Sequence, residues 1–248
     1  MKDLRELYIL GKPIDTKFGK VRFLKYHEYA NNIESIQLIS MNVLHIYYQY
    51  KKINKGDNPE INEEIENIKE HSLFEVALSI DYFIEAYLKI YRLVLDVEGG
   101  ETEHIDNKIK EIFENEDNFM LMRSIVMDMN LIKEEEVNPN PEIQEYIEAG
   151  RELERANAEK QSFSDIASSI VVGSGLTYED VANMSVLQVY ATYYRIAQMQ
   201  SYSTTVLYST VAEKVKVDAW NKHIDLFETK KAGMKMSEFN KKYGSLFG

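Results

Sequence analysis

The spacing of apolar residues predicts helices over most of this chain. In residues 25–52 apolar side chains recur three and four positions apart, at Ile33, Ile36, Val43, Ile46 and Tyr47. The same spacing continues through residues 60–97, after a cluster of helix breakers at Asn54-Lys-Gly-Asp-Asn-Pro59. We therefore expect two long helical regions, each with one apolar face.

The first two dozen residues follow a different pattern, which is typical of a β-hairpin. Glu6-Leu-Tyr-Ile-Leu10 is apolar and β-prone, Gly11-Lys-Pro13 is turn-forming, and residues 19–24 alternate as a half-buried strand does. An irregular arm is the alternative interpretation. The expected fold class is mainly α, a helical bundle-like protein with a small N-terminal β-hairpin.

Negative charge is concentrated in the middle of the chain. The formal net charge is −12, and residues 96–160 hold 19 acidic and 7 basic residues, so this stretch accounts for the whole imbalance. Helices are expected over residues 105–114 and 119–132, followed by a break at Asn138-Pro-Asn-Pro141. Residues 142–161 are polar and indicate a solvated helix or a hinge. We interpret the charge as solvated surface.

The last third carries explicit helix signals. Residues 163–172 form a short apolar run closed by Gly173-Ser-Gly175, a pair of glycines that a helix C-cap explains without a phosphate site. Thr177-x-x-Asp180 and Ser185-x-x-Gln188 are capping boxes, which predict a short helix over residues 178–183 and a long one over residues 186–209. Apolar residues on the long helix form two adjacent ridges, wide enough to pack against two neighbours.

A division of the chain follows from these patterns. We expect an N-terminal hairpin with long helices (1–97), an acidic helical insertion or hinge (98–160), and a C-terminal helical region (161–228). The last region includes Trp220, the single tryptophan, and a small apolar knot at His223-Ile-Asp-Leu-Phe227. Residues 229–248 carry five lysines against one glutamate and are expected to be a basic, mobile tail.

No pattern in the chain points to catalysis, a metal or a cofactor. Cysteine is absent, and the five histidines never pair at metal-binding spacing. Glu101-Thr-Glu-His104 matches one element of a di-iron bundle, but such a bundle needs a second copy that this sequence lacks. Phosphate-binding, dinucleotide-binding and nucleophile-elbow motifs are missing. We expect a protein that is not an enzyme, although scattered carboxylates leave an acid–base pair open.

Nucleic acid and membrane are not the expected partners. The main body lacks the basic face that releases counterions from a duplex. The segment 178–200 resembles a helix-turn-helix, yet its second helix offers only Arg195 among tyrosines and aliphatics. No apolar run approaches the roughly 20 residues of a membrane span, and the first residues lack a signal peptide's apolar stretch. The expected location is the cytoplasm.

Two segments resemble a known family. Residues 10–29, with Leu10-Gly-Lys-Pro-Ile-Asp15, Gly19, Phe23-Leu24 and Glu28-Tyr29, look like the start of tail assembly chaperones from phages and prophages of Gram-positive bacteria. Residues 176–202, with their "Leu-Thr … Met-Ser … Gln … Tyr … Tyr … Arg" pattern, are similar to that group's later helical region. Together they cover about a quarter of the chain. The acidic middle is not part of the resemblance.

The resemblance implies a chaperone of the host cytoplasm. Such proteins bind the tape measure protein, a long helical polymer, keep it soluble, help to recruit tail tube subunits, and are not retained in the virion. A protein of this kind needs exposed apolar and aromatic surface together with excess charge. The aromatic stripes also allow self-association into a homo-oligomer. Our hypothesis assigns partner binding to Tyr190, Tyr193, Tyr194, Met199, Tyr202 and Trp220.

Three other interpretations remain open from the sequence. The tyrosines of the long helix are core residues in most proteins with so broad an apolar face. A second interpretation is a structural tail or connector component that stays in the particle. A third is a helical enzyme or regulator with a site assembled from scattered carboxylates.

Overall fold

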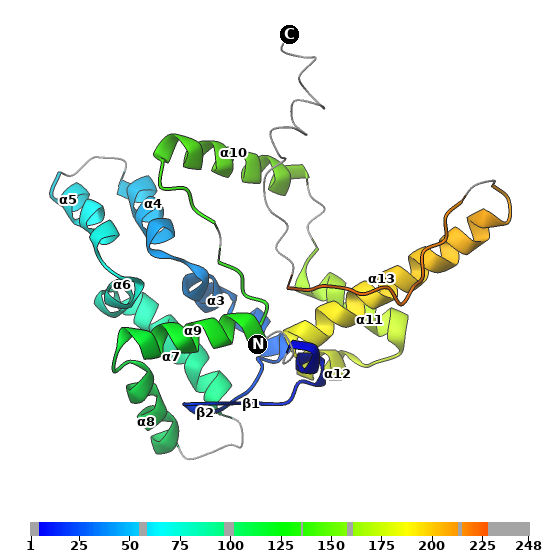
Figure 1. The fold of residues 1–248 in the computed structure, drawn as a ribbon, viewed down its shortest axis with the longest axis horizontal. Coiled ribbons are helices and arrows are strands. Elements are labelled where there is room, and N and C mark those ends of the chain that lie inside the picture. The colour runs from blue at the N-terminus through cyan, green and yellow to red at the C-terminus, as the bar shows by residue number, and fades with distance from the viewer. Residues whose placement is uncertain are drawn as a thin grey trace, which may run out of the picture.

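The computed structural model describes residues 5–54, 59–96, 102–134, 136–157, 161–212 and 215–227. They are mainly helical with one small sheet, which confirms the expected fold class (Figure 1). The first elements are η1 (Glu6–Leu10), β1 (Ile14–Thr16), β2 (Gly19–Val21), α2 (Tyr26–Asn31), α3 (Ile33–Ser40) and α4 (Val43–Asn54). The next are α5 (Pro59–Asn67), η2 (Ile68–Glu70), α6 (Leu73–Ser79), α7 (Asp81–Leu95), α8 (Thr102–Ile112) and α9 (Glu116–Met129). The last are α10 (Pro141–Asn157), α11 (Phe163–Ser174), α12 (Tyr178–Asn183) and α13 (Val186–Ser209).

The second strand of the predicted hairpin is confirmed as β2, whereas the first strand lies later in the chain than predicted, at β1. Strands β1 and β2 pair antiparallel, with Ile14 opposite Val21 and Thr16 opposite Gly19. Residues 6–10, predicted as the first strand, instead form the 3-10 helix η1. Gly11 adopts a left-handed conformation with φ +64°, and its N–H donates to the carbonyl of Tyr8 at 2.9 Å. This cap closes one turn, so that Tyr8 alone of the five residues is buried.

The single helix predicted over residues 25–52 is broken twice, into α2, α3 and α4. At the first break the amide of Asn32 donates to the carbonyl of Glu28 at 2.6 Å and competes with helix continuation. At the second break the side chain of Asn42 accepts from the N–H of His45 at 2.8 Å and starts α4. Residues 60–97 divide in the same way, and the capping box of Ser72 and Glu75 starts α6.

The larger hydrophobic core is built around α7. The side chains of Tyr87, Ile90, Tyr91 and Val94 on this helix are fully buried. Helices α8 and α9, predicted within the acidic stretch, contribute to the same core; their buried residues include Ile109, Ile112, Phe119, Met122 and Val126. The acidic segment therefore supplies core side chains as well as surface charge. The predicted boundaries at 97, 160 and 228 stay a prediction, and the tail 229–248 lies outside the described residues.

A buried arginine fixes α9 against the end of α3. Arg123 is 5% exposed and donates to the carbonyls of Ile39 at 3.0 Å and Met41 at 3.1 Å, and to Glu134 at 2.7 Å. Its charge is thus paired, and both carbonyls at the broken helix end gain a donor that the helix no longer supplies. Arg123 therefore stabilises the break that separates α3 from α4.

A smaller core joins α11, α12 and α13, and it contains one residue from far upstream. Its buried members are Tyr26, Ile166, Ile170, Val181 and Val189. The hydroxyl of Tyr26 donates to the carbonyl of Phe163 at 2.9 Å, and its backbone N–H donates to Met184 at 2.8 Å. In return, Leu187 at the start of α13 is buried in the larger core. Each core therefore holds a side chain from the other part of the chain.

Removing the ring of Tyr26 is expected to destabilise the protein by about 3–5 kcal/mol, because Tyr26→Ala leaves a cavity between the two parts. Tyr26→Phe keeps the ring and loses one hydrogen bond, at about 1 kcal/mol. Urea unfolding followed by circular dichroism measures both variants. Equal stability of the two variants would contradict the assigned role of this ring.

Candidate protein-binding surface

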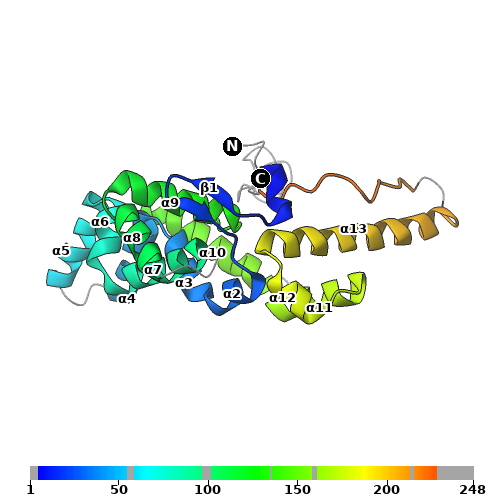
Figure 2. The same ribbon diagram turned by 90° about the horizontal axis from the view of Figure 1, so that it is seen from below.

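Helix α13 projects from the rest of the molecule. It has 24 residues, which corresponds to about 36 Å, and both views show its outer half extending away from the other helices (Figures 1 and 2). Its buried side chains are confined to the start, at Val186, Leu187 and Val189. The capping box of Ser185 and Gln188, predicted from sequence, is present and starts the helix beside Met184. The base of α13 is therefore fixed, and the rest emerges into solvent.

Helix α11 packs beside the middle of α13. A Cβ atom on Gly173 would lie 2.7 Å from Cγ2 of Ile196, so this glycine is what allows the two helices to approach. The predicted residues Tyr190 and Tyr193 lie half-buried in this contact, and Gln161 donates to the hydroxyl of Tyr193 at 2.7 Å. Burial, and next the neighbouring Tyr194, raise the pKa of Tyr190. These two tyrosines therefore help to hold α13 against α11.

Residues 215–227, which we name the strap, return along α13 to the main body (Figure 2). Arg195 donates to the carbonyls of Trp220 at 3.1 Å and Lys222 at 2.9 Å. The strap ends with Phe227, whose ring lies 6.1 Å from that of Tyr8. Between η1, the base of α13 and the strap lies a groove of about 830 Å³. The apolar knot predicted at residues 223–227 thus contacts η1.

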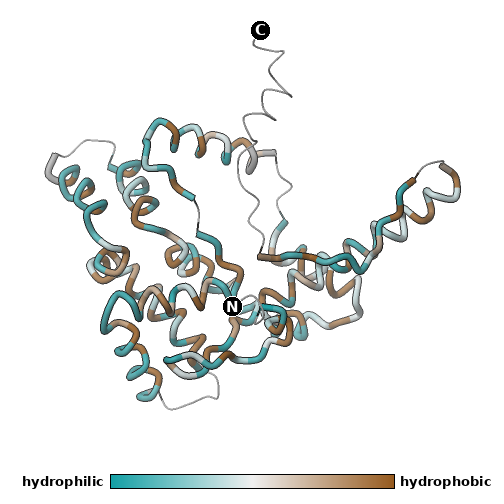
Figure 3. Tube along the Cα trace, in the orientation of Figure 1, coloured by the Kyte–Doolittle hydropathy of each residue, from teal (hydrophilic) through white to brown (hydrophobic). Residues whose placement is uncertain are grey.

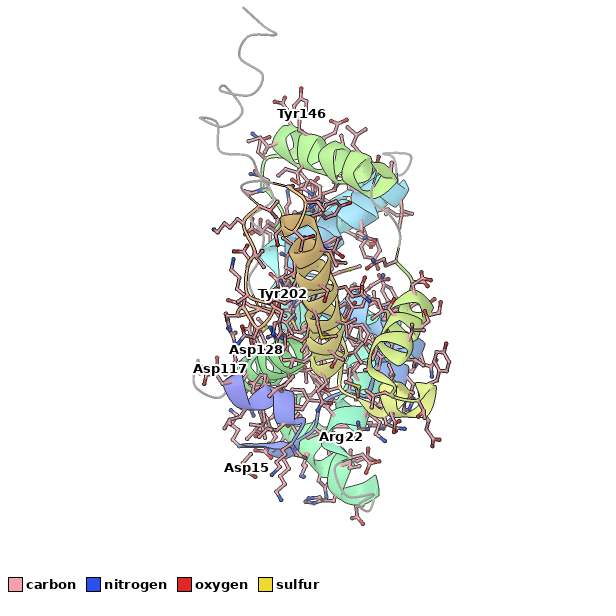
Figure 4. All side chains as sticks on the ribbon, turned by 90° about the vertical axis from the view of Figure 1, so that its right-hand side faces the viewer. Asp15, Arg22, Asp117, Asp128, Tyr146 and Tyr202 are labelled. Carbon is pink, nitrogen blue, oxygen red and sulfur yellow. The ribbon has the colours of Figure 1, made fainter. Side chains whose placement is uncertain are left out.

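Six large apolar side chains between Tyr194 and Val211, on α13 and in the turn that follows it, are exposed. Figure 3 shows hydrophobic positions recurring to the end of this helix, and Figure 4 shows Tyr202 on its side. The exposed fractions are Tyr194 45%, Met199 46%, Tyr202 36%, Leu207 69%, Tyr208 62% and Val211 83%. We name the surface formed by Tyr194, Met199, Tyr202, Leu207, Tyr208 and Val211 the arm surface.

The arm surface has almost no charge. Arg195 is the single charged residue between Val186 and Ala212, whereas a solvated helix normally carries several charges on its outer face. The hydroxyls of Ser203, Thr204 and Thr205 donate to carbonyls one turn back on the same helix, at 2.8–3.0 Å. Their hydrogen-bonding capacity is therefore partly used inside the helix. Such a surface is suited to contact with an apolar partner.

The structure separates the predicted binding residues into two groups. Tyr190 and Tyr193 are half-buried against α11, and Tyr194, Met199, Tyr202 and Trp220 are exposed. Trp220 lies on the strap and is 45% exposed. The sequence interpretation missed Leu207, Tyr208 and Val211. The lack of charge up to residue 212 is the signal that points to them.

Other chemistry is sparse in the described part of the chain. Among those residues no group of three His, Asp or Glu side chains is arranged to hold a metal ion, and Glu101 of the Glu-x-x-His motif lies outside them. Gly175 caps α11 in a left-handed conformation, and its N–H donates to Val171 at 3.1 Å. None of the helices that the structure describes combines the length and apolar character of a membrane span.

Comparison with known proteins divides the chain near α10. Residues 2–139 match the family model described as the YomV N-terminal domain, and residues 155–225 match the YomV second domain. The chain is 30% identical over 229 residues to the SPbeta prophage-derived protein YomV of Bacillus subtilis (strain 168), with 92% of each chain covered. No solved structure matches it. Most of the larger core falls in the first matched region, and α11–α13 fall in the second.

A methyl group at position 173 is expected to force α11 away from α13. Gly173→Ala should destabilise the protein by about 1–2 kcal/mol, because the stiff Ile196 side chain cannot withdraw. Adding Ile196→Ala removes the clash. The double variant should therefore be about 1 kcal/mol more stable than the sum of the two single-variant destabilisations predicts. Thermal or urea unfolding of the unmodified chain, the two single variants and the double variant measures this coupling. If the two destabilisations simply add in the double variant, the contact is ruled out.

Proposed function

The chain belongs to the YomV family, which includes a prophage-derived protein, and on that premise we propose that it is a phage tail assembly chaperone. In this proposal it binds the tape measure protein, keeps it soluble and helps to recruit tail tube subunits in the host cytoplasm. The observation that carries the proposal is the arm surface, in which exposed apolar side chains lie around a projecting and almost uncharged helix.

The arm surface suits a helical partner. Leu207, Tyr208 and Val211 are each more than half exposed and would be covered by a helix packed along α13. Each 100 Å² of apolar surface covered contributes roughly 2.5 kcal/mol before the entropy cost of association. Tyrosine and methionine combine contact area with adaptable packing, which favours binding to successive stretches of a long polymer.

Two further properties support a holding role over a catalytic one. The net charge of −12 favours solubility while an apolar surface is exposed. The sequence contains no nucleophile elbow, phosphate loop or cysteine. We therefore propose that the protein acts by binding alone and leaves the assembly before the tail is complete.

Substituting the end of the arm is expected to abolish partner binding without unfolding the protein. Leu207→Asp/Tyr208→Asp places two charges where the exposed fractions are 69% and 62%, so the fold tolerates them. Co-expression with the tape measure protein, followed by affinity purification, should recover at least 10-fold less of it than with the unmodified chain. Tyr178→Asp on α12 is the matched control, since Tyr178 is 62% exposed away from the arm. Full recovery with the double variant would remove the arm from the binding surface.

The chaperone role predicts absence from mature particles. Quantitative mass spectrometry of purified virions should detect the tape measure and tube proteins and find this chain below one copy per particle. Stoichiometric retention would instead identify a structural tail component.

A further inference from the structure

Helix α10 is oriented with its apolar face toward solvent. Ile143 is 46% exposed, Tyr146 81% and Leu153 65%, whereas Gln144 on the inner face is only 4% exposed. Figure 4 shows Tyr146 at the outer edge of the molecule. A Cβ atom on Gly150 would meet nothing within 4 Å. An amphipathic helix on a protein surface normally has the opposite orientation.

Polar contacts hold α10 in this orientation. Gln144 accepts from the N–H of Asn138 at 2.8 Å and donates to Glu148 at 3.0 Å, and Arg151 donates to the carbonyl of Glu136 at 2.8 Å. A cavity of about 470 Å³, lined mainly by polar side chains, lies between α10 and α4. Turning the apolar face inward would break these hydrogen bonds and bury Ile143 and Leu153 against polar groups.

The outer face of α10 has the dimensions and charge of a helix-docking site. Ile143, Tyr146, Gly150 and Leu153 are spaced at i, i+3, i+7 and i+10, which aligns them along one side of the helix. The small Gly150 in the middle of this stripe leaves room for a partner side chain. Two exposed glutamates, Glu142 and Glu145, lie on the side of the helix next to the stripe, whereas Glu152 lines the cavity toward α4. The site therefore favours a basic amphipathic helix.

Residues 229–248 of the same chain have the complementary pattern. This segment carries five lysines and one glutamate. Its apolar residues Met236, Phe239, Tyr243 and Leu246 repeat the spacing i, i+3, i+7 and i+10. In a helix they would share one face, with Lys235 and Lys242 along one edge. The eight residues between Phe227 and Met236 can extend to roughly 28 Å, which sets the reach of this segment from the end of the strap.

We infer that residues 229–248 dock as an amphipathic helix on the outer face of α10 in the same molecule. The apolar stripes of the two helices cover each other, and Lys235 and Lys242 face the glutamates of α10. Docking would place residues 229–248 on α10, the helix that links the two matched family domains. This inference is independent of the proposed function.

A single-cysteine reporter tests the docking, because the chain contains no cysteine. Ala149→Cys places a thiol beside the α10 stripe, and Ala197→Cys places one on α13; both alanines are exposed among the described residues. Reaction with a neutral maleimide should be about 10-fold slower at position 149 than at position 197. Equal rates would overturn the inference.

Charge reversal in the full-length chain identifies the occupant. Lys235→Glu/Lys242→Glu should raise the rate at position 149 about 10-fold, and the matched control Lys230→Glu/Lys231→Glu should leave it within twofold. Adding Glu142→Lys/Glu145→Lys, at the two exposed glutamates beside the stripe, to the first pair should restore slow labelling. Failure of this restoration would contradict the inference. Protection that grows with protein concentration, together with a dimer mass in light scattering, would assign the site to a second copy and overturn docking within one molecule.

Discussion

The placement of Tyr26 is the constraint on which the arrangement of this protein depends. Its ring belongs to the smaller core of α11–α13, although the residue starts the first regular helix of the N-terminal part. Leu187 of α13 is in turn buried in the larger core of the N-terminal part. Neither core is therefore complete without a side chain from the other part. Burial of large side chains contributes several kcal/mol, so the two parts are held in one orientation.

That orientation decides where α13 points. Its first turn is buried at the junction and the rest of the helix has no buried side chain, so the helix is fixed at its base and open along its outer half. The contact at Gly173 and the hydrogen bonds from Arg195 to the strap support its middle. A fixed, projecting helix with a single charged residue presents a preorganised surface, which lowers the entropy cost of binding a partner.

The two solvent-facing apolar surfaces differ in their surroundings. The arm surface is almost without charge, so it discriminates little between partner sequences and fits a protein that binds a long polymer at many positions. The stripe on α10 is accompanied by glutamates and fits one basic helix, which residues 229–248 can supply from the same chain. The acidic segment contributes to core packing through α8 and α9, and we propose that it also favours solubility and recognises a basic helix.

Local signals determined the helices of the last third. The capping boxes at Thr177 and Ser185 satisfy free amides within four residues, so α12 and α13 begin and end as their sequence predicts. The same local information failed at residues 6–10, because a short apolar run fits a strand or a turn of helix until Gly11 takes its left-handed conformation. Only the tertiary structure decided which tyrosines of α13 face α11, and that α10 turns its apolar side outward. Periodicity shows that a helix has an apolar face, whereas the direction of that face depends on contacts between residues far apart in the chain.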